Sequence, residues 1–598
     1  MKRAERGGIE AALSSPGFTG QLRTVIAALA GSPVVRKLKA LAVAIVVVVG
    51  ATAYGQILLN RWNKPFYDAL ARRDFPEFVA QLGVFCVIAG TLLVLNVVQR
   101  WLVESLKLRL REALVKDLVG RWLEPRRAFW LAGAGPIGVN PDQRMHDDAL
   151  KLCELSADLG VGLLQASVLL GSFAGILWAI SSGFAVRIGG VDYAVPGYML
   201  WAALLYAGLG SLLSLRVGRV LIVRNAERYA READLRFALV RVNEHLDGIS
   251  LAGGEPDERR RVEGILAELL AATRRLVRGI TDLTWVTAGF GWTALIAPTL
   301  VAAPLYLTGK ITFGGLMMAA AAFTQAQTSL RWFVDNFSQI AEWRATLLRV
   351  ATFRLALLTP LEQPGAGERI TYDDAPAGTL TIDGLVIPDA AGSLRLEPEH
   401  VVIRSPERVV VAAAPGVDKT LLFRALDGLR PWGRGRIGRP PDEAVLYMPR
   451  GTPYLPTGSL RDALCYPLAP RRFDDRTVRD ALERLGLARL VPELDVVRRW
   501  DRELGIDEQL ALAFARARLH APAWLVIDGG LGALDAETRA LAVDVFEHEL
   551  AGTAIIHIGA VDGASGRLFE RELRLVRATA APSPVPAADE DRKRGEAS

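Results

Sequence analysis

The stretch Val411-Ala-Ala-Ala-Pro-Gly-Val-Asp-Lys-Thr420 decides how the second half of this chain is interpreted. It follows part of the pattern GxxxxGK[ST], in which glycines let backbone N–H groups close around phosphates, a lysine reaches the terminal phosphates and a hydroxyl binds Mg²⁺. The two glycines of the pattern are replaced by Ala413 and Asp418. The retained residues are Gly416, Lys419 and Thr420. The sequence therefore predicts a phosphate-loop fold with an altered phosphate site.

The carboxylate of Asp418 is expected to lie beside the phosphate cradle. One like-charge contact at about 4 Å costs roughly 1 kcal/mol in water and about 4 kcal/mol at a protein-surface dielectric constant. That penalty corresponds to roughly one to three decades of affinity. ATP and Mg²⁺ are the ligands that the pattern implies, and Asp418 is expected to weaken their binding.

Short apolar runs alternate with helical segments between about 360 and 580. Such alternation predicts an α/β domain with a mostly parallel sheet. The run at 524–527 ends in the carboxylate of Asp528. The five runs are 380–382, 409–412, 444–447, 524–527 and 554–558.

The first 340 residues carry the apolar excess that raises the mean hydropathy of the chain to +0.24, with 51% hydrophobic residues. A membrane-spanning helix needs about 20 predominantly apolar residues. The last candidate contains Gln325, Gln327 and Arg331, so it is expected to face a cavity or a partner helix rather than lipid. A loop is expected from Asn60 to Leu70. The six candidate spans are about 38–59, 79–98, 159–180, 195–215, 284–307 and 312–334.

The distribution of positive charge predicts the orientation in the membrane. The long connections after the second and fourth spans are rich in arginine, whereas those near 183–193 and 309–312 are short. By the positive-inside rule, both termini and the C-terminal domain are expected in the cytoplasm, with the chain as a multi-pass protein of the cytoplasmic membrane. The net charge of +6 is attributed to contact with anionic lipid, and no nucleic acid partner is expected. The three cysteines, Cys86, Cys153 and Cys465, are expected to be free thiols.

Five segments of the membrane half resemble, in order, the transmembrane domain of the SbmA/BacA-like ABC transporters, which are related to the peroxisomal fatty-acyl ABC half-transporters. The resemblance implies six spans per chain and a partner half-transporter in a homodimer or heterodimer. The family moves peptides, cobalamin or other hydrophilic solutes, and some members lack an ATPase domain and resemble proton-driven importers. The segments are Asn60 to Leu70, Asn140-Pro-Asp-Gln-Arg144, Arg231 to Phe237, Trp332 to Asn336 and Ala341-Glu-Trp-Arg344.

The second half resembles an ABC ATPase domain, which allows each position of the nucleotide site to be assigned. Asp528 matches the Mg²⁺-holding carboxylate, and Gly529 stands where the family places the glutamate that orients water. Arg450 stands at the position of the glutamine loop, Asp535 is retained, and the switch histidine has no match unless His557 replaces it. The signature-like segment contains Leu504, Gly505, Asp507, Glu508 and Gln509, with Gly505 in place of a serine and Asp507 in place of a glycine.

These replacements predict an ABC-type ATPase domain that is deficient in hydrolysis, with no intact catalytic residue. Loss of a positioned base alone usually costs about 10²- to 10⁴-fold in rate. The expected organisation is an N-terminal segment (1–35), a six-span transmembrane domain of the ABC exporter type (36–355), a degenerate nucleotide-binding domain (360–577) and a disordered tail (578–598).

Three functions are compatible with these features. The chain could be a half-transporter whose heterodimeric partner supplies the intact catalytic groups. A homodimer would instead be driven by ions, with Asp335 as the candidate proton carrier. A membrane-bound regulatory subunit that does not transport is the third alternative. The sequence does not give the solute.

Overall fold

The computed structural model describes residues 17–578 except 134–137, 139, 182–184, 189–190, 360–367, 390–391, 415, 441–444 and 562–565. Two compact units make up the chain, and they divide near residue 361. Residues 1–16 of the expected N-terminal segment and residues 579–598 of the expected tail lie outside the described residues.

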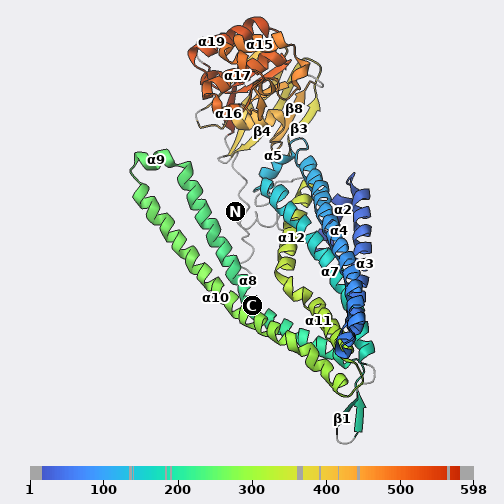
Figure 1. Ribbon diagram of the computed structural model, residues 1–598. Coiled ribbons are helices and arrows are strands. Elements are labelled where there is room, and N and C mark those ends of the chain that lie inside the picture. The colour runs from blue at the N-terminus through green and yellow to red at the C-terminus, as the bar shows by residue number, and fades with distance from the viewer. Residues whose placement is uncertain are drawn as a thin grey trace, which may run out of the picture. The chain divides into compact units, whose positions relative to one another are not determined.

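The first unit consists of long helices and one short hairpin (Figure 1). The hairpin pairs β1 (Ala185–Ile188) with β2 (Val191–Ala194). The long helices are α3 (Val35–Arg72), α4 (Phe75–Trp122), α7 (Ala149–Ile180), α8 (Tyr198–Glu244), α10 (Glu255–Leu307), α11 (Phe313–Asp335) and α12 (Phe337–Leu358). The shorter ones are α2 (Phe18–Ala30), α5 (Arg127–Ala132), α6 (Pro141–Gln143), the π-helical turn η2 (Arg144–Asp148) and α9 (Leu246–Leu251).

Within the described residues, five helices are long and apolar enough to cross a membrane: α3, α4, the continuous helix Pro141–Ile180, α8 and α10. The sixth expected span corresponds to α11, which is less apolar and contacts α3, α7, α8 and α10. It buries Ala319, Ala322, Phe323 and Ala326, together with the side chain of Gln327. As expected from its polar residues, α11 faces protein.

The prediction of a loop from Asn60 to Leu70 was wrong, because α3 continues as a helix to Arg72 and encloses Pro65. The polar residues that suggested a loop bind neighbouring helices instead. Asn60 Nδ2 donates to the carbonyl oxygen of Met318 at 3.1 Å, and Trp62 Nε1 donates to that of Gln81 at 2.8 Å. Because α3 continues to Arg72, only Arg73 and Asp74 separate it from α4.

Asp68 of this segment caps the start of α11. The first N–H groups of a helix have no partner within it, so a side-chain acceptor stabilises them. Asp68 Oδ1 accepts from the N–H of Gly314 at 2.8 Å, and Asp68 Oδ2 accepts from Thr312 Oγ1 at 2.9 Å. A Cβ atom on Gly314 would lie 2.1 Å from the carbonyl oxygen of Lys64, so only glycine permits this approach.

Buried ion pairs join α12 to the helices beside it. The carboxylate of Asp148 is 2.7 Å from Arg349 and 3.3 Å from Arg144, and Arg354 lies 2.7 Å from Asp117. Asp148 is 5% exposed and Arg354 4%, so each would be strongly destabilising without its partner. Two of the segments that suggested the family, 140–144 and 341–344, therefore lie on contacting elements.

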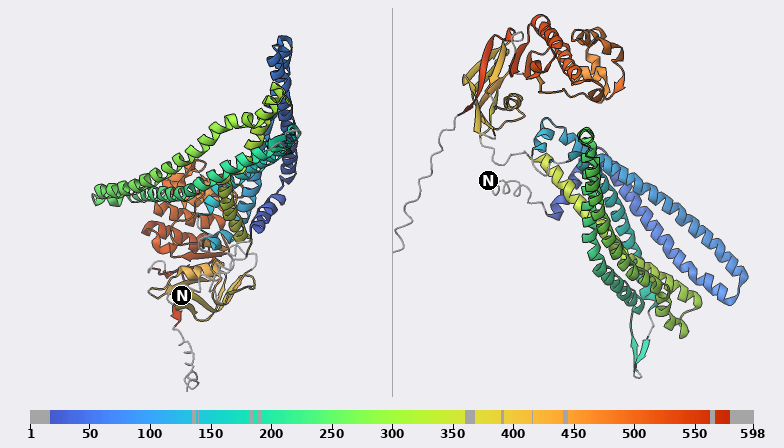
Figure 2. Two further views of the ribbon diagram at one scale, coloured as in Figure 1. Left: turned by 90° about the horizontal axis from the view of Figure 1, so that it is seen from below. Right: turned by 90° about the vertical axis from the view of Figure 1, so that its left-hand side faces the viewer.

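The helices α8 and α10 form a long antiparallel pair closed by α9 at one end (Figures 1 and 2). Arg275 holds Glu227 across the pair at 2.7 Å, and the Tyr206 hydroxyl donates to the carbonyl oxygen of Phe290 at 2.6 Å.

The second unit is built on a ten-stranded sheet in the order β3-β8-β4-β5-β14-β7-β13-β12-β9, with β6 paired to β4. The prediction of a mostly parallel sheet holds for one part only. Strands β14, β7, β13, β12 and β9 are parallel neighbours, whereas β4 pairs antiparallel with β5, β6 and β8. The sheet is therefore mixed. Its strands are β3 (Thr371–Asp374), β4 (Thr379–Asp389), β5 (Gly392–Glu397), β6 (His400–Arg404), β7 (Arg408–Ala413), β8 (Arg434–Arg439), β9 (Val445–Met448), β12 (Trp524–Asp528), β13 (Ala554–Ile558) and β14 (Arg571–Ala578).

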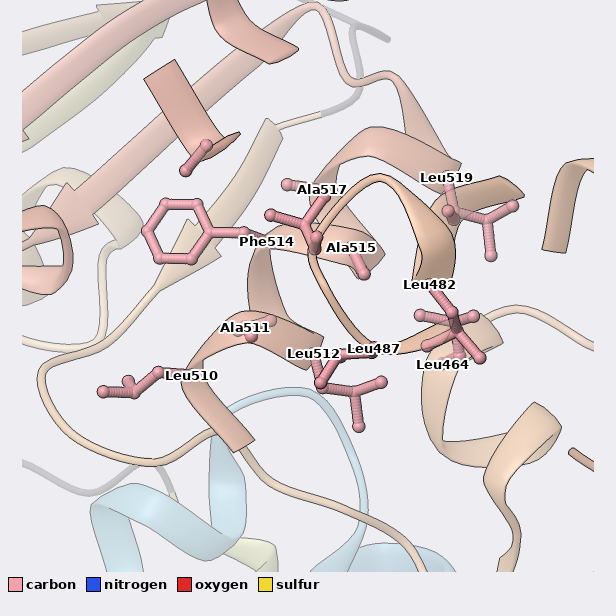
Figure 3. Packing of buried hydrophobic residues seen from close by; sticks show 14 of the residues in the cluster. Leu464, Leu482, Leu487, Leu510, Ala511, Leu512, Phe514, Ala515, Ala517 and Leu519 are labelled. Carbon is pink, nitrogen blue, oxygen red and sulfur yellow. The ribbon is translucent and has the colours of Figure 1, made fainter. Parts of the chain in front are cut away.

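Apolar residues cover both faces of the parallel strands. Successive strand residues point to opposite faces, so Val526 joins the cluster that contains α13 (Thr420–Asp427), while Leu525 and Ile527 join the cluster around α17 (Ile506–His520). Figure 3 shows side chains of α17 packed with Leu464 and Leu482. The other elements are β10 (Gly458–Ser459), β11 (Val497–Arg498), α14 (Leu460–Cys465), η3 (Pro470–Arg472), α15 (Asp475–Glu483), η4 (Ala488–Glu493), α16 (Trp500–Glu503), α18 (Gly530–Ala533), α19 (Ala536–Asp544) and η5 (Val545–Glu549).

We predict that Gly314→Ala destabilises the membrane unit by about 1–3 kcal/mol, the usual cost of inserting a methyl group into a packed site. The added Cβ would meet a backbone oxygen that cannot move without shifting α3. Thermal unfolding of the purified chain in detergent measures the effect.

The matched control is Gly90→Ala in α4, where a Cβ would have nothing within 4 Å. This variant is expected to leave the unfolding temperature unchanged or to raise it slightly, because alanine has the higher helix propensity. Equal unfolding temperatures for the two variants would contradict the assigned contact between α3 and α11.

Candidate functional site

The loop between β7 and α13 places Thr420 beside Asp528. Strands β7, β13 and β12 are adjacent and parallel, so the loops at their carboxyl ends meet at one edge of the sheet. Gly416 has a φ of +79°, which glycine adopts at little cost, and Thr420 opens α13. Thr420 Oγ1 donates to Asp528 Oδ2 at 2.8 Å. The structure thus brings together the two residues assigned to Mg²⁺.

Asp418 is exposed and turns its carboxylate to the start of α13. Its Oδ1 atom accepts from the N–H of Thr420 at 3.1 Å. An N–H at a helix start is the group that binds an anion such as phosphate. An acceptor from the chain itself therefore occupies a donor of the phosphate cradle.

Gly529 adopts a left-handed backbone conformation, with φ of +69°, immediately after the buried Asp528. Nothing lies within 4 Å of a Cβ built on it. A glutamate at this position would find space but would strain the backbone, since left-handed φ values cost non-glycine residues roughly 1–2 kcal/mol.

His557 lies at the centre of the sheet, where β13 pairs it with Val410 of β7 and Ile527 of β12. It is fully buried, and neither ring nitrogen has a hydrogen-bond partner among the described residues. Burial lowers the pKa of His557 to about 4, with Lys419 contributing in the same direction. The ring is therefore neutral at pH 7. His557 is therefore a core residue, and its role as a replacement for the switch histidine stays a prediction.

The signature-like segment forms the start of α17. Glu508 Oε2 accepts from the N–H of Gly505 at 3.1 Å, and its other oxygen contacts Arg489. Gln509 is buried and donates to the carbonyl oxygens of Asp501 and Leu504 at 3.1 and 2.9 Å. Leu504 is buried and Asp507 exposed.

Asp535 caps α19, whereas Arg450 is exposed in the loop after β9. Asp535 accepts from the N–H groups of Glu537 and Thr538 at 3.0 and 2.9 Å and from the Thr538 hydroxyl at 2.7 Å. The bonds from Thr538 hold the pKa of Asp535 below its usual value.

Arg516 helps to hold the loop after β9 in place, a role that the sequence did not predict. It is 8% exposed and donates to the carbonyl oxygens of Tyr454 and Ala463 at 3.1 and 2.5 Å. Burial lowers the pKa of Arg516 to about 10. The bond to Tyr454 ties the loop that carries Arg450 to α17. Only the position of Arg516 among the apolar residues from Leu510 to Ala517 could have indicated this role.

The residues fit Mg²⁺ better than they fit the phosphates of ATP. Thr420 and Asp528 supply a hydroxyl and a carboxylate within 2.8 Å of each other, the oxygen ligands that Mg²⁺ prefers. The carboxylate of Asp418 would repel bound phosphates, because both are negatively charged. Among the described residues, no group of three or more His, Cys, Asp or Glu side chains could hold a metal ion without a nucleotide.

In the other unit, Asp335 ends α11. Its carboxylate is 52% exposed and lies 3.6 Å from Arg331. Cys86 is exposed, Cys153 and Cys465 are buried, and all three are free, as expected.

Comparison with known proteins identifies the membrane half. Residues 27–307 match the family described as ABC transporter transmembrane region 2. The chain is 26% identical over 506 residues to the inner membrane ABC transporter ATP-binding protein YddA of Escherichia coli, covering 84% of this chain and 88% of that protein. It is also 26% identical to the chloroplastic ABC transporter D family member 2 of Arabidopsis thaliana over 588 residues (85% and 79%). Identity to mouse ATP-binding cassette sub-family D member 3 is 23% over 522 residues (80% and 75%).

We predict that acid destabilises the second unit through His557. Between pH 6.5 and 4 the unfolded chain binds a proton at this residue while the folded chain does not, so the free energy of unfolding falls as pH falls. The loss approaches about 3 kcal/mol at pH 4, because one pKa unit corresponds to about 1.4 kcal/mol. Calorimetric unfolding of the full chain from pH 7 to pH 4.5 measures it.

The variant His557→Gln should show a shallower dependence on pH, with a remainder from His520, whose pKa burial also lowers. His548→Gln is the matched control, because the His548 side chain is 68% exposed. An unchanged slope in the His557 variant would contradict the assignment.

Proposed function

Because this chain is an ABC transporter half with fused membrane and ATP-binding domains, we propose that it moves a solute across the cytoplasmic membrane while its own site hydrolyses ATP poorly. The relative in Escherichia coli is named as an inner membrane protein, and the arginine-rich connections favour both termini in the cytoplasm. A second half-transporter would complete the twelve-helix conduit.

One observation carries the proposal of impaired hydrolysis. The carboxylate of Asp418 lies at 3.1 Å from the N–H of Thr420, in a position that bound phosphate would need. A phosphate must displace this carboxylate and then tolerate its charge nearby. Affinity for nucleotide falls as a result.

The remaining groups support metal binding but not turnover. Bound ATP with Mg²⁺ would supply the phosphoryl group whose transfer drives ABC transport. Lys419 would bind the terminal phosphates, and Thr420 and Asp528 would hold the metal ion. Gly529 has no side chain to orient water, and phosphoryl transfer depends on positioning and electrostatics.

The two alternatives remain open as predictions. A proton-driven importer requires a carrier, and Asp335 is half exposed beside Arg331. A regulatory subunit requires no solute pathway. The experiment that decides between transport and regulation is solute uptake by the reconstituted chain.

We predict that Asp418→Gly raises the affinity for ATP by about one to three decades, because it removes both the internal acceptor and the like charge. Equilibrium binding of a fluorescent ATP analogue to the purified chain measures the change. Asp427→Asn, at the opposite end of α13, is the matched control and should leave affinity unchanged. Equal affinities of the wild type and Asp418→Gly for the ATP analogue would contradict the proposal that Asp418 weakens nucleotide binding.

We also predict that the purified chain hydrolyses ATP only at background rates and that Lys419→Ala leaves this rate unchanged. Gly529→Glu should not restore turnover by itself, because the left-handed backbone misdirects the new side chain and Asp418 still opposes nucleotide. The rate of phosphate release from ATP measures hydrolysis by the purified chain and by each of the two variants. Rates ordinary for transporters that Lys419→Ala abolishes would show the site to be a working ATPase.

A further inference from the structure

A cavity of about 520 Å³ lies in the membrane unit, between the α8–α10 pair and the bend that joins α11 to α12. Pockets of roughly 300–1,000 Å³ take drug-sized ligands. The bend arises at Asn336, whose side-chain amide donates to the carbonyl oxygen of Trp332 at 2.8 Å and ends α11.

The cavity wall is largely apolar. Leu276, Ile280 and Leu283 of α10 line one side, and Val334 and Phe337 line the other. Spacing of three and four residues places the three α10 side chains on one helix face. Such a wall favours the apolar body of a ligand over a fully hydrated solute.

Asp335 is the one ionisable side chain among the described residues that line the cavity. Its side chain is 52% exposed, and the ion pair that it forms with Arg331 is 3.6 Å long, beyond the length of a good charged hydrogen bond. The carboxylate therefore keeps accepting capacity toward the cavity. Hydroxyl and amide groups of Ser214, Asn225, Thr287 and Ser338 complete the polar lining.

We propose that this cavity is a solute-binding site for a drug-sized amphipathic organic cation, with the positive group on Asp335 and the apolar body along α10. The inference rests on the proposed transport function and deepens it by naming a class of solute. One carboxylate in an apolar wall selects against anions of the same size, because an anion would be desolvated beside a like charge.

Tetraphenylphosphonium and tetraphenylborate provide a test, since they share size and shape and differ in the sign of charge. Equilibrium dialysis with the purified full chain in detergent should show binding of the cation in preference to the anion. Asp335→Asn should weaken cation binding about tenfold, the loss expected for one charged contact. Leu276→Trp should weaken it as well, by filling the cavity.

The control is Glu227→Gln, which makes the same chemical change on α8 at a residue paired with Arg275 outside the cavity lining. It should leave cation binding unchanged. Equal binding of the two ions, or cation binding insensitive to Asp335→Asn, would overturn the proposal. Failure of the cation to bind, or its displacement by added phosphatidylethanolamine, which would assign the cavity to lipid, would also overturn it.

Failure of the inference and failure of the proposed function give different results. Cation binding that depends on Asp335 in a chain that moves no solute after reconstitution would support the site and count against transport. Solute uptake by a chain whose cation binding ignores Asp335 would support transport and reject the site.

Discussion

Backbone N–H groups at the starts of helices need hydrogen-bond acceptors. In both units an aspartate side chain supplies such an acceptor. In the membrane unit, Asp68 reaches from α3 to the N–H of Gly314 and fixes α11 against its neighbour. In the second unit, Asp418 takes the N–H of Thr420 at the start of α13. The same interaction is structural in the first case, and under the proposed function it would compete with bound phosphate in the second. A carboxylate at a helix start leaves function unaffected only where that helix start does not have to bind an anion.

Buried charge organises the membrane unit around α12. Asp148 binds Arg349 and Arg144, and Asp117 binds Arg354, in surroundings where an unpaired charge would be costly. The ion pairs therefore fix the position of α12 relative to η2 and α4.

The nucleotide site combines retained and altered parts for separable physical reasons. The Thr420–Asp528 pair depends on the parallel order of β7, β13 and β12, which the hydrophobic core maintains whether or not nucleotide binds. Gly529, by contrast, has a left-handed φ that a glutamate would not adopt freely. The fold can thus persist whether or not the site turns over nucleotide. His557, buried without a partner in the described structure, adds a cost to acidification at the same centre.

The sequence by itself determined the order of the elements. Runs of apolar residues predicted the helices long enough for a membrane, and short runs ending in Asp528 or preceding Lys419 predicted strands, because length and hydrophobicity are local properties. Only the tertiary structure decided what distant residues do. The residues from Asn60 to Leu70 resemble a loop in composition, yet contacts with α11 and α4 hold them in a helix. Asp335 lines a cavity whose other walls come from elements far away in the chain. Arg516 likewise donates a hydrogen bond to the carbonyl oxygen of Tyr454, in a loop distant in the sequence. Such pairings depend on packing geometry, which no local pattern of residues contains.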